Sequence, residues 1–317
     1  MGKKAFIYPG QGAQFVGMGK DFYDNFSVSK EVFEEANESL GMDIKKVCFE
    51  GSEEELLKTE NTQPAILATS IAILKALETI GINYDYTAGL SLGEYSALVG
   101  AEALDFSEAV PLVKKRGKYM QQAVPLGKGG MAAILGLEKE KVIEAIHSVK
   151  DYGVVEIANY NSPGQIVISG EMEVLKLAVK EAKELGAKKT VLLPVSAPFH
   201  SSLLRPAGEM LEEELRKVHI NDLKKVVVTN ADAKPLKDKS EIIPSLVRQV
   251  SSSVLWCDSV NTMLDNGVDT FIEIGPGKSL TGFVRRIAKT IDKEVNTFNI
   301  SNIDDFKKVC SFFSEGE

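Results

Sequence analysis

The segment from residue 128 to residue 195 constrains the fold more than any other part of the chain. Hydrophobic periodicity predicts that its elements follow one another as strand, helix, strand, strand, helix and strand. This β-α-β-β-α-β order is the split βαβ arrangement of ferredoxin-like domains. We therefore expect a small ferredoxin-like domain here, built from strands at 131–135, 154–158, 165–168 and 190–193 and helices at 139–149 and 172–185.

The sequence on either side predicts a larger domain that the small one interrupts. Glycines precede the first strand of the small domain, and Pro194 and Pro198 follow its last strand. We predict an α/β-hydrolase-like domain with a parallel sheet over residues 1–126 and 198–317, with the ferredoxin-like domain inserted at 127–197. The elements predicted for the large domain are strands at 4–8, 86–88, 225–229 and 270–274 and a buried helix at 64–80.

Composition excludes several classes of function. The net charge of −8 argues against nucleic-acid binding, which needs a basic face to neutralise phosphates. No apolar run reaches the roughly 20 residues of a membrane helix, and the first residues lack the apolar core of a secretory signal. Cys48, Cys257 and Cys310 are too far apart in sequence for a disulfide framework or a closely spaced metal-ligand pair. We expect a cytoplasmic protein that binds neither nucleic acid nor membrane.

The pentapeptide Gly89-Leu90-Ser91-Leu92-Gly93 has the Gly-x-Ser-x-Gly pattern of a nucleophile elbow. In this motif a strand turns sharply into a helix, and the glycines leave room for a strained serine with an exposed hydroxyl. A chance Gly-Ser turn at a helix start would also fit the five residues. The strand predicted before them and the helical turn predicted after them favour Ser91 as a nucleophile.

An attacking serine needs a base, and His200 is the best placed of the three histidines. His147 lies inside a predicted helix, and His219 follows a helical segment. His200 instead follows the predicted strand 190–193, in a loop that two prolines keep extended. Because loops at the carboxyl ends of strands form the sites of α/β proteins, we predict that His200 is the base.

The sequence pattern does not decide which group orients the imidazole of His200. In α/β-hydrolases the acid lies between the serine and the histidine, but no acid between Ser91 and His200 stands at a clear strand end. Either a later acid such as Asp232 or Asp258 orients the imidazole, or a neutral carbonyl does so and the site is a Ser-His dyad.

Blocks spread over almost the whole chain resemble those of malonyl-CoA:acyl carrier protein transacylases and keep the family's order. The resemblance implies that malonate passes from coenzyme A to the serine and then to the phosphopantetheine thiol of acyl carrier protein, in bacterial fatty acid synthesis without a metal or other cofactor. The blocks are Tyr-Pro-Gly-Gln-Gly-Ala-Gln at 8–14, Gly-Leu-Ser-Leu-Gly-Glu-Tyr-Ser at 89–96, Arg116, Ala-Asn-Tyr-Asn-Ser-Pro-Gly-Gln at 158–165, Val-Ser-Ala-Pro-Phe-His at 195–200 and Ile-Glu-Ile-Gly-Pro-Gly at 272–277.

The resemblance also implies a role for each group in the chemistry. Ser91 resembles the nucleophile and His200 the general base. The backbone N–H groups of Gln11 and Leu92 resemble an oxyanion hole, which stabilises the tetrahedral intermediate. Gln249 resembles the residue whose main-chain carbonyl holds the histidine, which would account for the missing acid.

Substrate recognition is implied for three further residues. Arg116 resembles the guanidinium that pairs with the free malonyl carboxylate through a two-point fork. Phe199 resembles a pattern linked with the choice of malonyl over methylmalonyl, and Asn159 resembles a polar residue near the site. Leu90 departs from the family, which commonly has histidine there. Because the reacting residues are untouched, we expect the chemistry to survive.

Three other functions fit parts of this pattern. A serine esterase or thioesterase would use the same serine and histidine, and a non-enzymatic carrier-binding module would leave the elbow vestigial. A stand-alone polyketide acyltransferase is poorly separated from the fatty-acid role by sequence alone. We expect a monomer whose partners are a coenzyme A thioester and acyl carrier protein. Carrier proteins are generally acidic, so the positive clusters at 188–189 and 285–286 are candidate docking surfaces.

Overall fold

The computed structural model describes residues 2–195 and 197–314. Ser196, part of one block of the family resemblance, lies outside the described residues. The strands are β1 (Lys3–Tyr8), β2 (Tyr86–Gly89), β3 (Gly129–Leu135), β4 (Val155–Ser162), β5 (Gln165–Glu171), β6 (Lys189–Leu192), β7 (Val226–Val228), β8 (Val268–Ile274) and β9 (Asn296–Ile300). Within the described part of the chain they form a five-stranded sheet, ordered β7-β2-β1-β8-β9, and a four-stranded sheet, ordered β4-β5-β3-β6.

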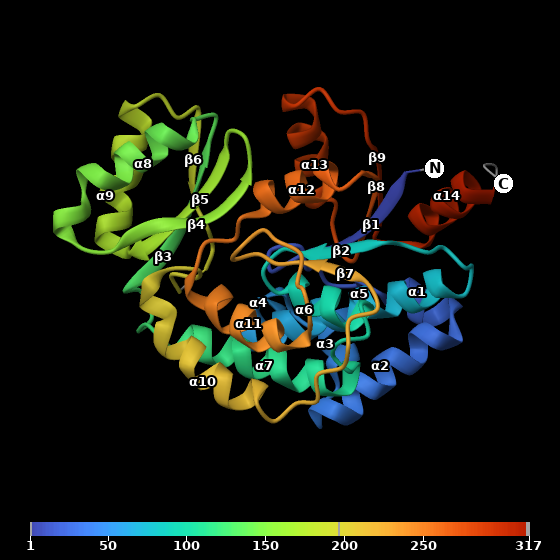
Figure 1. The fold of residues 1–317 in the computed structure, drawn as a ribbon. Coiled ribbons are helices and arrows are strands. Elements are labelled where there is room, and N and C mark those ends of the chain that lie inside the picture. The colour runs from blue at the N-terminus through green and yellow to red at the C-terminus, as the bar shows by residue number, and fades with distance from the viewer. Residues whose placement is uncertain (1, 196, 315–317) are drawn as a thin grey trace.

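Helices cover both sheets (Figure 1). The α-helices are α1 (Lys20–Asn25), α2 (Ser27–Leu40), α3 (Ile44–Phe49), α4 (Glu53–Leu57), α5 (Thr59–Glu78), α6 (Gly93–Gly100), α7 (Phe106–Gln122), α8 (Lys139–Ser148), α9 (Met172–Glu184), α10 (Arg205–Leu215), α11 (Ile242–Ser251), α12 (Trp256–Asp265), α13 (Ser279–Thr290) and α14 (Ile303–Ser314). Short 3-10 helices lie at η1 (Lys150–Tyr152), η2 (Ser202–Leu204) and η3 (Lys239–Glu241).

The large sheet is parallel in every pairing, with β1 at its centre. Successive side chains of β1 point to opposite faces, so Phe6 and Tyr8 join one core cluster while Ala5 and Ile7 join the other. Helices α12 and α13 cover one face, and α5 and α6 cover the other, with α7 packed on α5 farther from the sheet (Figure 1). A strand buried on both faces reads as a continuous apolar run, which is how β1 appears in the sequence.

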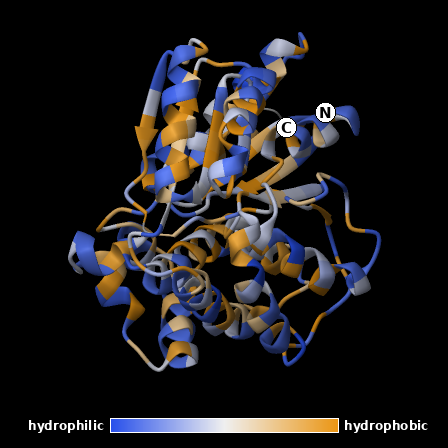
Figure 2. Ribbon diagram, turned by 90° about the vertical axis from the view of Figure 1, so that its left-hand side faces the viewer, coloured by the Kyte–Doolittle hydropathy of each residue, from blue (hydrophilic) through white to orange (hydrophobic). Residues whose placement is uncertain are grey.

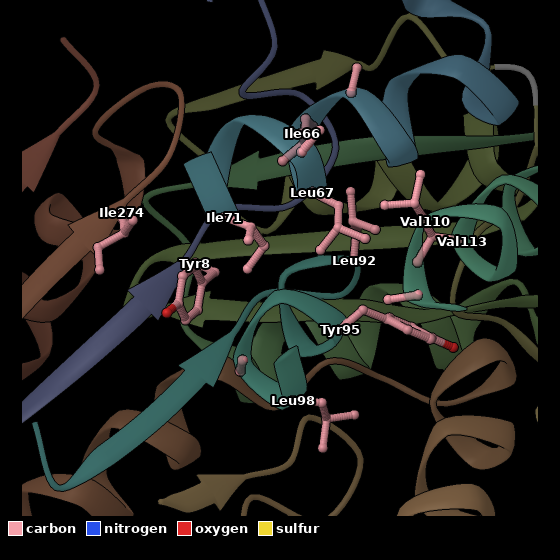
Figure 3. Packing of buried hydrophobic residues seen from close by; sticks show 14 of the residues in the cluster. Tyr8, Ile66, Leu67, Ile71, Leu92, Tyr95, Leu98, Val110, Val113 and Ile274 are labelled. Carbon is pink, nitrogen blue, oxygen red and sulfur yellow. The ribbon is translucent and has the colours of Figure 1, made fainter. Parts of the chain in front are cut away.

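The helix predicted at 64–80 overlaps α5, which begins earlier, at Thr59, and ends at Glu78, and whose side chains are buried along most of its length. Figure 3 shows its apolar side chains beside those of α6 and α7, next to the end of β1. Burying one such Leu or Ile stabilises the fold by about 1.5–3 kcal/mol. The labelled side chains in that view are Tyr8, Ile66, Leu67, Ile71, Leu92, Tyr95, Leu98, Val110, Val113 and Ile274.

The small sheet has the predicted order of elements, β3, α8, β4, β5, α9 and β6, and every neighbouring pair of strands is antiparallel. Helices α8 and α9 pack on its outer face, with apolar residues turned inward and polar residues outward (Figures 1 and 2). The predicted fold class, a parallel α/β sheet with a smaller ferredoxin-like sheet, is confirmed. The domain limits at 126/127 and 197/198 stay a prediction.

The chain enters and leaves the small sheet at one point. A Cβ placed on Gly129, the first residue of β3, would lie 2.5 Å from Pro198 Cδ. Only a glycine permits this close approach. The two connections to the large sheet therefore run side by side.

No helix in the described part of the chain is both long enough and apolar enough to cross a membrane.

Candidate active site

The candidate site lies where the carboxyl ends of three neighbouring strands meet. Gln11 follows β1, Ser91 follows β2 and Asn230 follows β7. Because the strands are parallel, these loops emerge at the same edge of the sheet, which is where α/β proteins bind ligands.

Two glycines bring the loops after β1 and β2 into direct contact. A Cβ on Gly10 would lie 2.3 Å from the carbonyl oxygen of Leu90, and one on Gly93 would lie 2.2 Å from that of Tyr8. Neither position has room for a side chain. The backbone before Gln11 is therefore packed against the turn that carries the serine.

Ser91 occupies the sharp turn between β2 and α6, as the pentapeptide predicts. Its φ of 54° lies in the left-handed region, which is unusual and strained for a residue other than glycine. A Cβ on Gly89 would lie 1.9 Å from the carbonyl carbon of Gly93, so the turn closes only with glycine there.

His200 lies in hydrogen-bond contact with the serine. Its Nε2 is 2.7 Å from Ser91 Oγ, and its Nδ1 is 2.9 Å from the main-chain oxygen of Gln249. A carbonyl only accepts, so Nδ1 carries the hydrogen and Nε2 is left to accept from the serine hydroxyl. Of the alternatives that the sequence leaves open, the structure places a neutral carbonyl at Nδ1, while Asp232 pairs with Arg248.

Burial keeps the imidazole neutral. His200 is 4% exposed, and desolvation together with the positive charge of Arg116 lowers its pKa to about 4. A neutral imidazole at pH 7 has a free lone pair on Nε2 that can take a proton from the serine.

Arg116 is a buried cation on α7, and its hydrogen-bond partners Gln63, Ser91 and Gln249 are all neutral. It is 1% exposed, and burial lowers its pKa. Its Nη1 donates to Gln63 Oε1 and its Nη2 to Gln249 Oε1, each at 2.8 Å, and Nη2 lies 3.2 Å from Ser91 Oγ. Across residues 2–195 and 197–314, no carboxylate lies within 4.0 Å of its nitrogens as an ion pair. The site therefore holds a positive charge that an anionic ligand could pair with.

A cavity of about 430 Å³ opens over the serine, lined by residues of both sheets. Gln249 is fully buried and is not among the residues that line it. The other predicted site residues that line the cavity are Gln11, Ser91, Leu92, Arg116, Asn159, Phe199 and His200. A larger cavity of about 710 Å³ shares Gln11, Gly12, Leu193 and Val195 with it but does not reach the serine or the histidine.

Sequence reasoning missed three polar residues that contact the predicted ones. Gln63 binds the guanidinium of Arg116. Asn230 accepts a hydrogen bond from the backbone N of Ser91, and Glu94 accepts one from the backbone N of Asn230. A signal existed for two of them: Asn230 stands at the end of a predicted strand, and Gln63 is a polar residue in an apolar helix. Glu94 stood out only as an acidic residue near a helix N-terminus.

The fold and this site define an acyltransferase class. The chain belongs to the acyl transferase family, since the model of the acyl transferase domain matches residues 5–306.

Its relatives within that family are malonyl CoA-acyl carrier protein transacylases, which confirms the resemblance seen in the sequence blocks. The protein of that name from Bacillus subtilis (strain 168) is 48% identical over 92% of this chain and 92% of its own length. The one from Staphylococcus aureus (strain MRSA252) is 44% identical over 97% of this chain and 98% of its own length.

Solved structures give the same result. The malonyl CoA-acyl carrier protein transacylase from Clostridium perfringens matches with a TM-score of 0.94 at 50% identity, covering 99% of this chain and 98% of that one. A malonyl-transacylase, PlMCAT, solved in complex with the type II PKS acyl-carrier protein AntF, matches with a TM-score of 0.94 at 39% identity, covering 98% of this chain and 99% of that one.

Proposed function

We propose that this protein moves malonyl from malonyl-CoA to the phosphopantetheine thiol of acyl carrier protein through an acyl-enzyme on Ser91. The observation that carries the proposal is the guanidinium of Arg116, which lies 3.2 Å from Ser91 Oγ among neutral partners. A cation at that distance from the nucleophile suits an acyl group that ends in its own carboxylate. The names of the relatives support the same substrate.

The first half-reaction begins when His200 Nε2 accepts the proton of Ser91 Oγ. The oxygen attacks the thioester carbon, and the backbone N–H groups of Gln11 and Leu92 stabilise the oxyanion. Leu92 stands at the start of α6, where the first N–H groups have no acceptor inside the helix. The imidazolium then protonates the sulfur of coenzyme A, and the thiol leaves.

The second half-reaction runs the same steps in reverse with the carrier thiol. His200 takes the thiol proton, the thiolate attacks the ester of Ser91, and the proton returns to Oγ as the ester bond breaks. The carbonyl of Gln249 holds the histidine in one tautomer through both halves. These steps draw only on groups of this chain and of the two substrates, and we propose that no cofactor takes part.

Substrate choice follows from burial of the cation. Malonate satisfies Arg116 with a two-point ion pair, whereas acetyl would leave the charge facing a methyl group. Asn159 and Phe199 line the same cavity, and we assign them to binding of the acyl group.

We propose an acidic acyl carrier protein as the partner and the cytoplasm as the location, with the protein acting as a monomer. Lys188 and Lys189 are exposed and offer a positive surface to such a carrier. Arg286 is less available, because it donates to Ser162 and Gln165.

The direct test is a competition between malonyl-CoA and acetyl-CoA. The protein is incubated with both, and the adduct on the Ser91 peptide is identified by mass. We expect malonyl to dominate, to persist in water and to leave when carrier protein is added. Equal labelling by acetyl would remove the role of Arg116, and rapid hydrolysis without a thiol would indicate an esterase.

A further inference from the structure

Glu94 is a buried carboxyl group that the proposed reaction does not use. It lies in the first turn of α6, three residues after the nucleophile, and is 1% exposed. Burial raises its pKa to about 7, opposed by hydrogen bonds from Gln249 and Asn230 and by the charge of Arg116. A buried acid is costly unless it is hydrogen-bonded, so its contacts need an explanation.

One oxygen of Glu94 accepts two hydrogen bonds from distant parts of the chain. Its Oε2 is 2.9 Å from the backbone N of Asn230, which follows β7, and 2.9 Å from Nε2 of Gln249, which lies on α11. The carboxyl oxygen thus fixes the positions of both amide residues relative to α6.

Asn230 in turn holds the strained nucleophile. Its Oδ1 accepts from the backbone N of Ser91 at 2.6 Å, and its Nδ2 donates to the carbonyl of Gly89 at 2.7 Å. These bonds hold the backbone of the elbow at the strained Ser91 and at Gly89. They oppose relaxation of the left-handed conformation at Ser91.

Gln249 holds the other two reacting groups. Its main-chain oxygen accepts from His200 and its Oε1 accepts from Arg116, while its Nε2 also donates to the carbonyl of Ser91 at 3.0 Å. A shift of Gln249 would therefore move the base and the guanidinium together, relative to the nucleophile.

We propose that Glu94 is a positioning residue whose Oε2 holds Ser91, His200 and Arg116 in one fixed geometry. The part that concerns malonyl selection rests on the proposed function. Because a single oxygen accepts both bonds, the position of the acceptor matters more than the charge of the carboxyl group.

Two variants of Glu94 separate position from charge. Glu94→Gln removes the charge but keeps an oxygen at the same reach, so we expect transfer to fall only about fivefold. Glu94→Asp keeps the charge but withdraws the acceptor by one methylene, so we expect kcat to fall about 100-fold through misplacement of the reacting groups. The preference for malonyl over acetyl should fall in the Asp variant as well, because Arg116 is held through Gln249.

Ser29→Ala is the matched control. Ser29 is fully buried, and its hydroxyl donates to the carbonyl of Ala72 at 2.7 Å, between α2 and α5. Its loss should lower thermal stability while kcat and the malonyl preference stay at wild-type values. A purely structural role for Glu94 would give the same result as this control.

A second reaction separates failure of this inference from failure of the proposed function. Phenylmethylsulfonyl fluoride modifies an activated serine and carries no malonate, so its rate with Ser91 measures the serine and histidine geometry for any acyl donor. If the wild type forms no malonyl adduct, the proposed function fails and sulfonylation still tests Glu94.

A Gln variant as slow as the Asp variant, or an Asp variant as fast as the wild type, would overturn the inference. If the Asp variant does not fold, the Gln variant alone decides. A folded Gln variant whose transfer rate has fallen about 100-fold would overturn the inference.

Discussion

At the scale of single residues, the site depends on charge held in a dry environment. His200 is neutral because it is buried near a cation, and Arg116 keeps its charge among neutral hydrogen-bond partners. Burial disfavours the charged form of each side chain, which suits a base that must be neutral and leaves the guanidinium in need of an anionic partner. Burial therefore sets the direction of the pKa change of both His200 and Arg116.

Replacement of Arg116 by lysine tests the two-point ion pair. Lys keeps a positive charge but presents one ammonium in place of a planar fork, and it cannot bridge Gln63 and Gln249 in the same way. We expect malonyl transfer to fall about 100-fold, or about 2.7 kcal/mol, while acetyl transfer changes little. Steady-state kinetics with both donors would show this. An equal loss for the two donors would point to general damage to the site.

The pH dependence of acylation tests the buried histidine. The base works when neutral, and His200 has its pKa lowered to about 4. We expect the acylation rate of the free enzyme to stay level as pH falls from 8 through 6 and to drop only near pH 4. Quenched single-turnover experiments measure it, with circular dichroism at each pH as the control for folding. A midpoint near the ordinary value of 6.5 would show that the imidazole is solvated.

The same titration predicts how stability depends on pH. In the unfolded chain His200 has its ordinary pKa of 6.5, so between pH 6.5 and about 4 the unfolded state binds one more proton than the folded state. His200 therefore lowers the free energy of unfolding as pH falls through that window. Glu94 acts in the opposite sense, because its raised pKa makes the folded state bind more protons between pH 4.5 and about 7. We expect Glu94→Gln to steepen the loss of stability on acidification, measured by denaturant titration at several pH values. An unchanged slope would contradict the raised pKa of Glu94.

At the scale of elements, the nucleophile elbow depends on backbone contacts. We expect Gly89→Ala to unfold the protein or abolish acylation, since the new Cβ would overlap the backbone of Gly93. Gly282→Ala is the control: it lies in α13 with nothing within 4 Å of the new Cβ, and we expect it to stabilise the fold by about 0.5–1 kcal/mol. Denaturant titration and Ser91 labelling measure both variants. A folded, active Gly89→Ala protein would show that the turn can relax.

The elements were the most predictable part of the structure. Local periodicity is enough to place β1, the helix in α5 and the alternation from β3 to β6, and the pentapeptide with its neighbours is enough to predict the elbow. The contacts made by Asn230 and Gln63 were not predictable, because they join residues 139 and 53 positions from their partners. Without the fold, nothing in the local sequence pairs an asparagine with one particular backbone N–H.

At the scale of the whole molecule, a net charge of −8 opposes binding of an acidic carrier unless a local surface is positive. We expect the double substitution Lys188→Glu and Lys189→Glu to raise KM for the carrier severalfold and to weaken its dependence on salt, with KM for malonyl-CoA less affected. Transfer assays at several ionic strengths measure this. Unchanged kinetics with the carrier would remove this surface as the docking site.

The assembly of the site from two sheets was only partly predictable. The order of elements predicts the insertion, and the blocks of the resemblance indicate the candidate residues. How the small sheet closes over the serine depends on packing between segments far apart in sequence, such as Arg286 of α13 with Ser162 and Gln165 of the small sheet.

The contact between Gly129 and Pro198 has a consequence for how such proteins diversify. Because the two connections to the small sheet touch, we expect that the sheet could be exchanged between relatives as one unit, with both splice points at the same buried contact. Met131 and Asn159 would be exchanged with the small sheet, while Ser91 and His200 would be unchanged. Recombination at this junction would alter the wall that faces the acyl group and leave the reacting atoms in place.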